Sequence, residues 1–99
     1  MRQKLIHTNQ SIRIYARIRN VNGDLSDPDV IEFQYTKPND TEVTTYTIGR
    51  IVKESTGIFY INLEIEDPGR HKYTWVTDGS LKSAYKGFFE AIDHQWERP

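Results

Sequence analysis

The sequence contains no cysteine, a single methionine and no long run of apolar residues. Without cysteine the chain has neither disulfide bridges nor thiolate ligands, which excludes a disulfide-stapled secreted module and a thiolate zinc site. Among the first ten residues the only apolar run is Leu5-Ile6, too short for the apolar region of a signal peptide. No segment reaches the length of a membrane span. We therefore expect the chain to be made in the cytoplasm.

The chain also lacks an excess of either charge. Thirteen Lys and Arg residues stand against fourteen Asp and Glu residues, so the net charge is -1. A balance of this kind gives no field that favours nucleic acid or an anionic membrane, and we expect neither as a partner. The length of 99 residues is enough for one domain with one hydrophobic core.

What the sequence does contain is alternation of apolar and polar residues, most clearly between residues 56 and 77. Phe59, Ile61, Leu63 and Ile65 alternate with polar residues in one run, and His71, Tyr73 and Trp75 do so in a second. The segment Glu66-Asp67-Pro68-Gly69 joins them. Period-2 alternation predicts two strands connected by a tight corner, with these side chains on one side of a sheet.

Five further strands are predicted around this pair, because short alternating or β-prone runs are separated by turn-forming residues. They cover residues 11–19, 30–36, 42–48, 51–53 and 84–92. The third is interpreted as an edge strand, and its inward face is left open between Val43/Thr45/Thr47 and Thr44/Tyr46/Ile48. Gly87 in the last strand indicates a bulge or a close backbone approach to an aromatic ring such as that of Trp75.

Seven short strands without any helical periodicity are typical of an all-β, antiparallel sandwich. We divide the chain into an N-terminal arm over residues 1–10, a sandwich domain over residues 11–92 and a C-terminal tail over residues 93–99. The alternation also predicts which side chains face the core: Ile12, Ile14, Ile18, Ile31, Phe33, Phe59, Ile61, Leu63, Tyr73, Trp75 and Phe89.

Two groups of residues could bind metal or act in catalysis. Asp24, Asp27 and Asp29 could offer carboxylates to calcium, but their spacing matches no calcium-binding loop, and turn chemistry accounts for them more simply. The three histidines are scattered along the chain, and no motif such as G-x-S-x-G marks a nucleophile. We expect no enzyme activity, no metal and no cofactor, with His71 in a structural role.

The outward residues of the first alternating run carry the best candidate for a protein contact. Arg13, Tyr15, Arg17 and Arg19 combine charge with large contact area, as residues that dominate protein interfaces do. Trp96 in the C-terminal tail is the expected anchor of that tail. The alternative without a partner is a solvated, cationic sheet face that prevents unwanted strand pairing. Exposed rings, including Tyr85 and Trp96, leave a carbohydrate-binding module open as a second function.

Several segments together resemble one family. The segment STGIFYINLEIEDPGRHKYTW, followed by AYKGFFEA, is similar to small immunoglobulin-like domains encoded by tailed bacteriophages. The upstream segment SDPDVIEFQYTKPNDTEVTTYT resembles the strand pair of the same family. The likeness covers residues 26–92 and implies a seven-stranded immunoglobulin-like sandwich.

Two departures from the family pattern bear on local structure. His71 stands where the family has a tyrosine after Pro-Gly, which puts a tyrosine-corner hydrogen bond at that position in doubt and leaves Tyr73 as an alternative. The family's turn glycine is also missing after Pro38. We therefore expect Asn39 or Asp40 to adopt any positive φ that this turn requires.

The resemblance implies a non-catalytic structural protein of a tailed-phage virion, incorporated into the particle after synthesis in the host cytoplasm. Its partners would be capsid, portal, neck or tail subunits, contacted in several symmetric copies. Attachment to the head surface and attachment at the head–tail neck or tail are both compatible with the sequence. A carbohydrate-binding module or a host-surface adhesion domain is the alternative.

Overall fold

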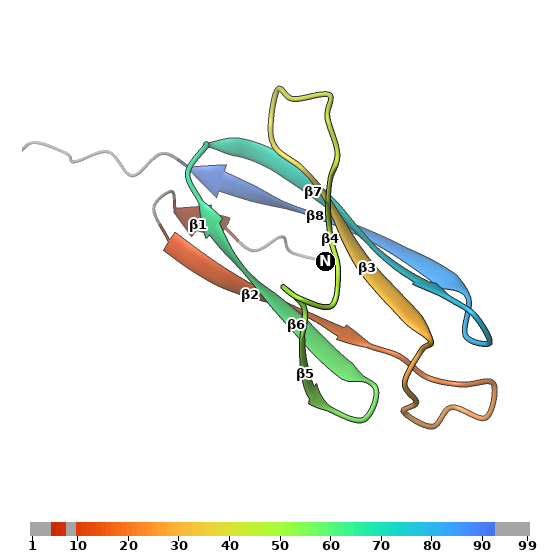
Figure 1. Ribbon diagram of the computed structural model, residues 1–99. Coiled ribbons are helices and arrows are strands. Elements are labelled where there is room, and N and C mark those ends of the chain that lie inside the picture. The colour runs from red at the N-terminus through yellow and green to blue at the C-terminus, as the bar shows by residue number, and fades with distance from the viewer. Residues whose placement is uncertain (1–4, 8–9, 93–99) are drawn as a thin grey trace, which may run out of the picture.

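The computed structural model describes residues 5–7 and 10–92, and the regular elements in these ranges are eight β-strands (Figure 1). They are β1 (Leu5–His7), β2 (Gln10–Arg17), β3 (Val30–Thr36), β4 (Thr44–Tyr46), β5 (Val52–Ser55), β6 (Ile58–Ile65), β7 (Gly69–Asp78) and β8 (Ser83–Ile92). The described residues include no helix with the length and apolar character needed to span a membrane.

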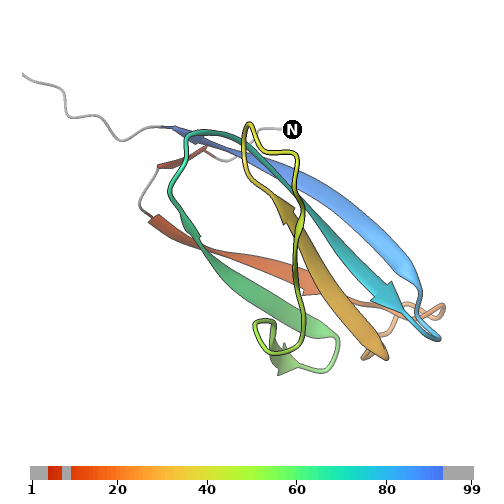
Figure 2. The same ribbon diagram turned by 45° about the horizontal axis from the view of Figure 1, so that its top comes forward.

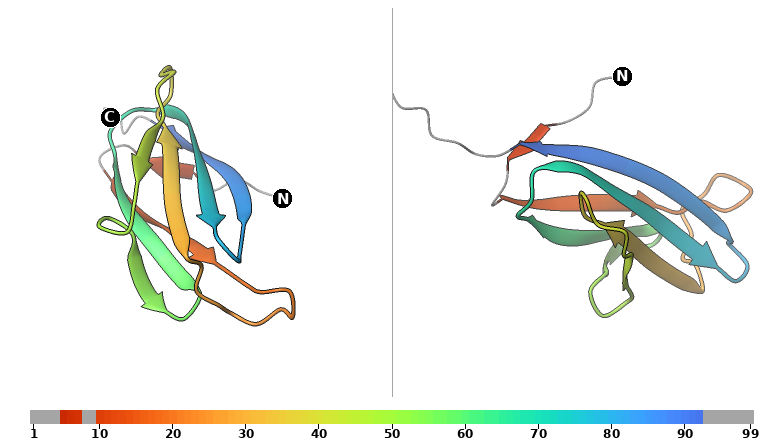
Figure 3. Two further views of the ribbon diagram at one scale, coloured as in Figure 1. Left: turned by 45° about the vertical axis from the view of Figure 1, so that its right-hand side comes forward. Right: turned by 90° about the horizontal axis from the view of Figure 1, so that it is seen from above.

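The strands form two sheets that pack face to face. One sheet has the order β1-β8-β7-β3-β4 and the other the order β2-β6-β5. Seen from above, β7 and β8 lie in one layer and β2 in the other (Figure 3). Strands β2 to β8 pair in antiparallel fashion, four against three, and this arrangement is an immunoglobulin-like sandwich. The connection from β4 to β5 crosses between the sheets along one side (Figure 2).

The structure has one strand more than the seven predicted, β1, and this strand lies within the predicted N-terminal arm over residues 1–10. Within this arm, β1 pairs in parallel with β8 of its own chain, and the register joins Leu5 to Glu90 and His7 to Ile92. Three residues are too few to show alternation, so the order of apolar and polar residues does not predict this strand. Gln10 also belongs to β2, which begins one residue earlier than expected.

The expected corner between residues 66 and 69 joins two sheets instead of two neighbouring strands of one sheet. β6 pairs with β2 and β5, whereas β7 pairs with β3 and β8. The apolar faces of β6 and β7 therefore face each other across the sandwich, and the prediction that they share one side of a sheet is wrong. Alternation marks the buried face of a strand but does not identify the sheet to which the strand belongs.

Most predicted strands lie close to their observed bounds, and β3 agrees at both ends. The predicted edge strand shortens to β4 and lies at the edge of its sheet, where Tyr46 packs against the core while Ile48 is exposed. In the turn before β4, Asn39 has a φ of 61°. Asparagine tolerates this conformation better than most residues, which explains how the turn forms without glycine.

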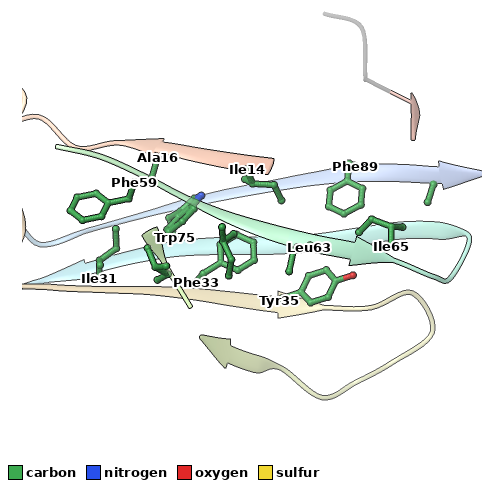
Figure 4. Packing of buried hydrophobic residues seen from close by; sticks show 13 residues of the cluster. Ile14, Ala16, Ile31, Phe33, Tyr35, Phe59, Leu63, Ile65, Trp75 and Phe89 are labelled. Carbon is green, nitrogen blue, oxygen red and sulfur yellow. The ribbon is translucent and has the colours of Figure 1, made fainter. Parts of the chain in front are cut away.

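The core lies between the two sheets and is filled by aliphatic and aromatic side chains from both (Figure 4). Of the expected core residues, Ile12, Ile18 and Tyr73 are partly buried against the cluster, and the other eight are buried. Further buried side chains, absent from the expected set, come from both layers: Ala16, Tyr35, Ile51, Ile65, His71, Thr77 and Ala91.

Gly87 allows a close approach of the kind expected, although the ring involved is that of Tyr73. Tyr73 is the cross-strand partner of Gly87, and a Cβ atom at Gly87 would lie 2.5 Å from the Tyr73 ring. The missing side chain lets this ring lie over the β8 backbone and stack on Phe33, with 5.5 Å between the ring centroids.

Candidate protein-docking surface

Three of the predicted contact residues lie in a row on β2. Arg13, Tyr15 and Arg17 are exposed on the outer face of the three-stranded sheet, because Ile14 and Ala16 between them point into the core. In the antiparallel register with β6, Arg13 is opposite Asn62 and Tyr15 is opposite Tyr60. Side chains of directly paired residues lie on the same side of a sheet, so β6 contributes to the same surface. We call these five residues the β2–β6 face.

Contacts within the β2–β6 face order its large side chains. The guanidinium carbon of Arg13 lies 3.9 Å from the centroid of the Tyr60 ring, and its Nε donates to Asn62 Oδ1 at 3.0 Å. The rings of Tyr15 and Tyr60 are tilted, with centroids 5.5 Å apart. The Tyr15 hydroxyl donates to Glu54 Oε1 at 3.1 Å. A partner would therefore meet side chains that are already held in place, which lowers the entropic cost of binding.

Arg17 differs from its neighbours in this row. It forms no side-chain hydrogen bond or ion pair with residues 5–7 or 10–92, while Arg13 is engaged with both Tyr60 and Asn62. The charge of Arg17 is thus available to an external carboxylate. Arg and Tyr are enriched among the residues that contribute most to protein interfaces.

The remaining predicted contact residues are not brought onto this face. Arg19 lies beyond the end of β2, where its Nη1 donates to the Gly23 carbonyl at 2.9 Å and its backbone forms a bridge with Leu25. It therefore helps to close the loop that follows β2. Trp96 lies outside the described residues.

The opposite outer face of the sandwich offers a less open surface. Phe88 on β8 is exposed, but the Arg70 guanidinium carbon lies 4.4 Å from the centroid of its ring. Arg70 Nε in turn donates to Glu90 Oε2 at 2.8 Å. The charge of Arg70 is compensated by Glu90, so this face offers a weaker electrostatic contact than Arg17 does.

Sequence reasoning missed Tyr60 and Asn62 as parts of the β2–β6 face, and it missed Glu54 of β5 as the acceptor for the Tyr15 hydroxyl. Alternation does indicate that Tyr60 and Asn62 point away from the core, since Phe59, Ile61 and Leu63 are buried between and beside them. Only the pairing of β2 with β6 brings them next to Arg13 and Tyr15, and a pattern along one strand cannot predict that partner.

Two of the three aspartates of the loop before β3, Asp27 and Asp29, have structural partners for their carboxylates. Asp27 Oδ2 forms an ion pair with Lys53 Nζ at 2.6 Å, and its Oδ1 accepts from the Gly57 amide at 2.8 Å. The hydrogen bond from Lys53 is the main cause that lowers the pKa of Asp27. Asp29 accepts from the Ser80 amide at 3.0 Å. Within residues 5–7 and 10–92, no group of three His, Asp or Glu residues could hold a metal ion.

His71 is almost completely buried near the start of β7, next to the corner between β6 and β7. Its Nε2 lies 2.8 Å from the Asp67 carbonyl oxygen, which can only accept, so Nε2 carries the proton and donates. Its Nδ1 lies 2.6 Å from the Tyr35 hydroxyl and accepts from it in this neutral form. The ring is stacked between Tyr35 and Phe89. His71 thus fixes the chain where it passes from one sheet to the other.

Replacing His71 with phenylalanine should lower the free energy of unfolding by about 2 kcal/mol, because the ring is kept while the Tyr35 hydroxyl and the Asp67 carbonyl lose their partner. Urea denaturation would measure the change. The double variant His71→Phe/Tyr35→Phe no longer contains the Tyr35 hydroxyl, so only the Asp67 carbonyl is left without its partner. Its loss of unfolding free energy should therefore be smaller than the sum of the losses in the two single variants. Additive losses would contradict this arrangement.

Tyr35 should make the fold sensitive to alkali. Burial raises the pKa of Tyr35 to about 12 from the ordinary 10.0. Since the unfolded chain ionises first, this contribution to stability is complete below pH 10 and is lost as the pH rises through about 12. The urea midpoint of the parent should therefore fall relative to that of Tyr35→Phe as the pH rises from 10 to about 12. Parallel curves would contradict the burial of this hydroxyl.

Comparison with known proteins supports the fold. No protein-family model matches the sequence, and no curated protein does. A candidate glycoside hydrolase from Bacteroides vulgatus ATCC 8482 contains a similar structure, with a TM-score of 0.62 and 13% identity over 94% of this chain. The chain spans 17% of the length of that protein. The ZIG-8 IG1 homodimer is similar over 92% of this chain and 80% of its own, with a TM-score of 0.52 and 15% identity. At these identities the likeness shows the immunoglobulin-like fold alone.

Proposed function

We propose that the chain is a non-catalytic structural protein of a tailed-phage particle, held there by protein contacts through the β2–β6 face. The observation that carries the contact is the ordered Arg13–Tyr15–Tyr60 cluster next to the uncompensated charge of Arg17. The resemblance of residues 26–92 to phage immunoglobulin-like domains supports the particle as the location. The chain would be made in the host cytoplasm and join the capsid, the neck or the tail during assembly.

The side chains that could act in catalysis have other roles in this proposal. Both ring nitrogens of His71 are engaged in hydrogen bonds that hold the corner. Asp27 and Asp29 accept hydrogen bonds from backbone amides that close loops. The chain then works by presenting a surface, and repetition around a symmetric particle would let weak individual contacts give firm attachment.

Cosedimentation with assembled particles that lack the chain tests this proposal. The purified protein should be retained, and the variant Tyr15→Ala/Arg17→Glu should lose at least about tenfold in apparent affinity, as interface Tyr and Arg residues often do. Lys72→Glu is the matched control, since Lys72 is exposed on the five-stranded sheet and should not matter. No retention of the parent protein, or equal retention of both variants, would contradict the proposal.

Carbohydrate binding is the second candidate function. It is favoured by the exposed rings of Tyr15 and Tyr85. Aromatic faces that are open to solvent suit the apolar faces of sugars. A glycan array would support this candidate if it shows a signal that Tyr85→Ala or Trp96→Ala abolishes. Absence of any signal would remove it.

A further inference from the structure

The sandwich is open along one edge, between β2 and the first part of β8. β8 pairs with β7 along residues 83–91, but on its other edge β1 pairs only with residues 90–92. Among the described residues, no strand therefore pairs with the outer edge of residues 83–89. β2 likewise has a described neighbour only on the β6 side. Figure 3 shows the start of β8 and the end of β2 running along the same side of the molecule.

A cleft of about 540 Å³ lies between these two edges. Ala16 and Ile18 of the β2 side line it, as do Leu81 and Tyr85 of the β8 side, and Trp75 lies at its inner end. Its volume falls in the range of sites that hold ligands. Residues 18–21, which follow β2, and residues 80–82 of the turn before β8 also line the cleft.

The core is incomplete beside this cleft. Tyr85 pairs with Trp75, so its side chain points to the core side of the sheet, yet 64% of its surface is exposed. Phe89 and Ala91 on the same face of β8 are buried. The difference arises because the sandwich has no layer opposite Tyr85. An added segment would therefore bury a large aromatic surface that the isolated chain leaves in water.

The indole N–H of Trp75 is a polar group without a partner in the described part of the chain, which indicates a place for a ligand. Its side chain is only 3% exposed, and its Nε1 is buried without a hydrogen-bond partner among the described residues. In Figure 4 this nitrogen lies on the side of the ring toward β2, the strand that carries Ala16. An unpaired buried N–H is unfavourable, and Trp75 is one of the residues that line the cleft.

The charges around the cleft are of one sign. Arg17, Arg19 and Lys82 line it, and no Asp or Glu does. The chain as a whole carries a net charge of -1, so this local excess is not a general property of the surface. Arg17 and Lys82 form no ion pair with the described part of the chain. The rim is therefore complementary to an anionic partner.

We propose that an extended, acidic segment of a partner protein adds to the free edge of β8 and occupies this cleft. Its backbone pairs with residues 83–89, and its alternate side chains enter the cleft, where one carries an acceptor to Trp75 Nε1. Its carboxylates meet Arg17, Arg19 and Lys82 at the rim. Strand addition suits this site because an unpaired edge supplies backbone hydrogen bonds and the cleft supplies specificity. The site adjoins the β2–β6 face and shares Tyr15 and Arg17 with it, whereas Leu81, Lys82 and Tyr85 belong to the cleft alone.

Titration of the full chain with an alternating Glu-Val peptide of about eight residues tests the proposal, since that length covers the free edge. ¹H–¹⁵N spectra should show shifts of the amide signals of residues 83–89 and of the indole N–H signal of Trp75. The variant Trp96→Phe lacks the second indole and so identifies the signal of Trp75. Lys82→Glu should weaken binding about fivefold to tenfold through the loss of charge complementarity, while Lys72→Glu should leave it unchanged.

Two altered probes separate strand addition from simpler binding. The same peptide with N-methylated valines cannot donate backbone hydrogen bonds there, and it should not bind. An alternating Lys-Val peptide should also fail. The proposal is overturned if the Glu-Val peptide causes no shifts, if either altered peptide binds equally well, or if glutarate or an oligosaccharide alone reproduces the shifts. It is also overturned if sedimentation shows that a second copy of the chain already fills the cleft. None of these results depends on attachment to a particle.

Discussion

Replacing Trp75 with alanine is expected to remove about 3 to 5 kcal/mol from the free energy of unfolding. Trp75 is 3% exposed and packs edge-on against Phe33, with 4.8 Å between the ring centroids. A domain of this size has a total stability of only about 5 to 15 kcal/mol, so the variant should be largely unfolded at a moderate temperature. Urea denaturation followed by circular dichroism would measure the loss.

A milder substitution at the same position separates the contribution of ring packing from that of the indole N–H. Trp75→Phe keeps an aromatic ring and removes the unpartnered Nε1, so its loss of stability should be clearly smaller than that of Trp75→Ala. If Trp75→Ala leaves the thermal midpoint unmoved, Trp75 does not belong to the core and the inward face of β7 is misassigned.

The second large effect is expected at Gly57, in the turn between β5 and β6. Its φ is 75°, and a Cβ atom there would lie 2.7 Å from the Ser26 amide nitrogen and 2.9 Å from the Ile18 carbonyl oxygen. Both atoms belong to the backbone and cannot move aside by a side-chain rotation. Gly57→Ala should therefore cost about 3 kcal/mol or more, through strain at positive φ together with overpacking.

Two other glycines provide matched controls for Gly57→Ala. Gly23 has a φ of 87° but no atom within 4 Å of an added Cβ, so Gly23→Ala should show the strain alone, about 1 kcal/mol. Gly49 has neither a positive φ nor a neighbour within 4 Å. Gly49→Ala should be neutral or slightly stabilising. Equal stabilities for the three variants would contradict the close packing of the turn against the loop after β2.

The sequence predicts the half-buried strands well for a physical reason. In β2, β3 and β6 one face packs on the core and the other meets solvent, which gives clear alternation. The short edge strand β4 bears a weaker pattern, because only Tyr46 of its three residues contacts the core. β1 pairs with β8, and backbone pairing leaves no trace in the order of side chains.

The surfaces were predictable only in part. The row Arg13, Tyr15 and Arg17 follows from alternation along one strand, but Tyr60 and Asn62 join it only through the pairing of β2 with β6. The cleft was not predicted at all. It is formed where two strands far apart in the sequence leave their edges unpaired, and the sequence does not show which edges stay free.

The sequence predicts a structural role for His71 but not the contacts that its ring makes. The resemblance raised doubt about a corner hydrogen bond at this position, and the structure shows that histidine makes one through Nε2. The same ring also accepts from Tyr35, which lies 36 residues earlier in the chain. Such a long-range partner is a product of the fold and could not be derived from the local pattern.

Quantitative mass spectrometry of purified particles, with the chain counted against the major capsid protein, tests the proposed function most directly. We expect the chain to be present at a fixed ratio. Hundreds of copies would place it on the head surface, whereas about five to a dozen would place it in a ring at the neck or tail, because closed rings follow the cyclic symmetry of the particle. Absence of the chain from particles produced by cells that express it would contradict the account.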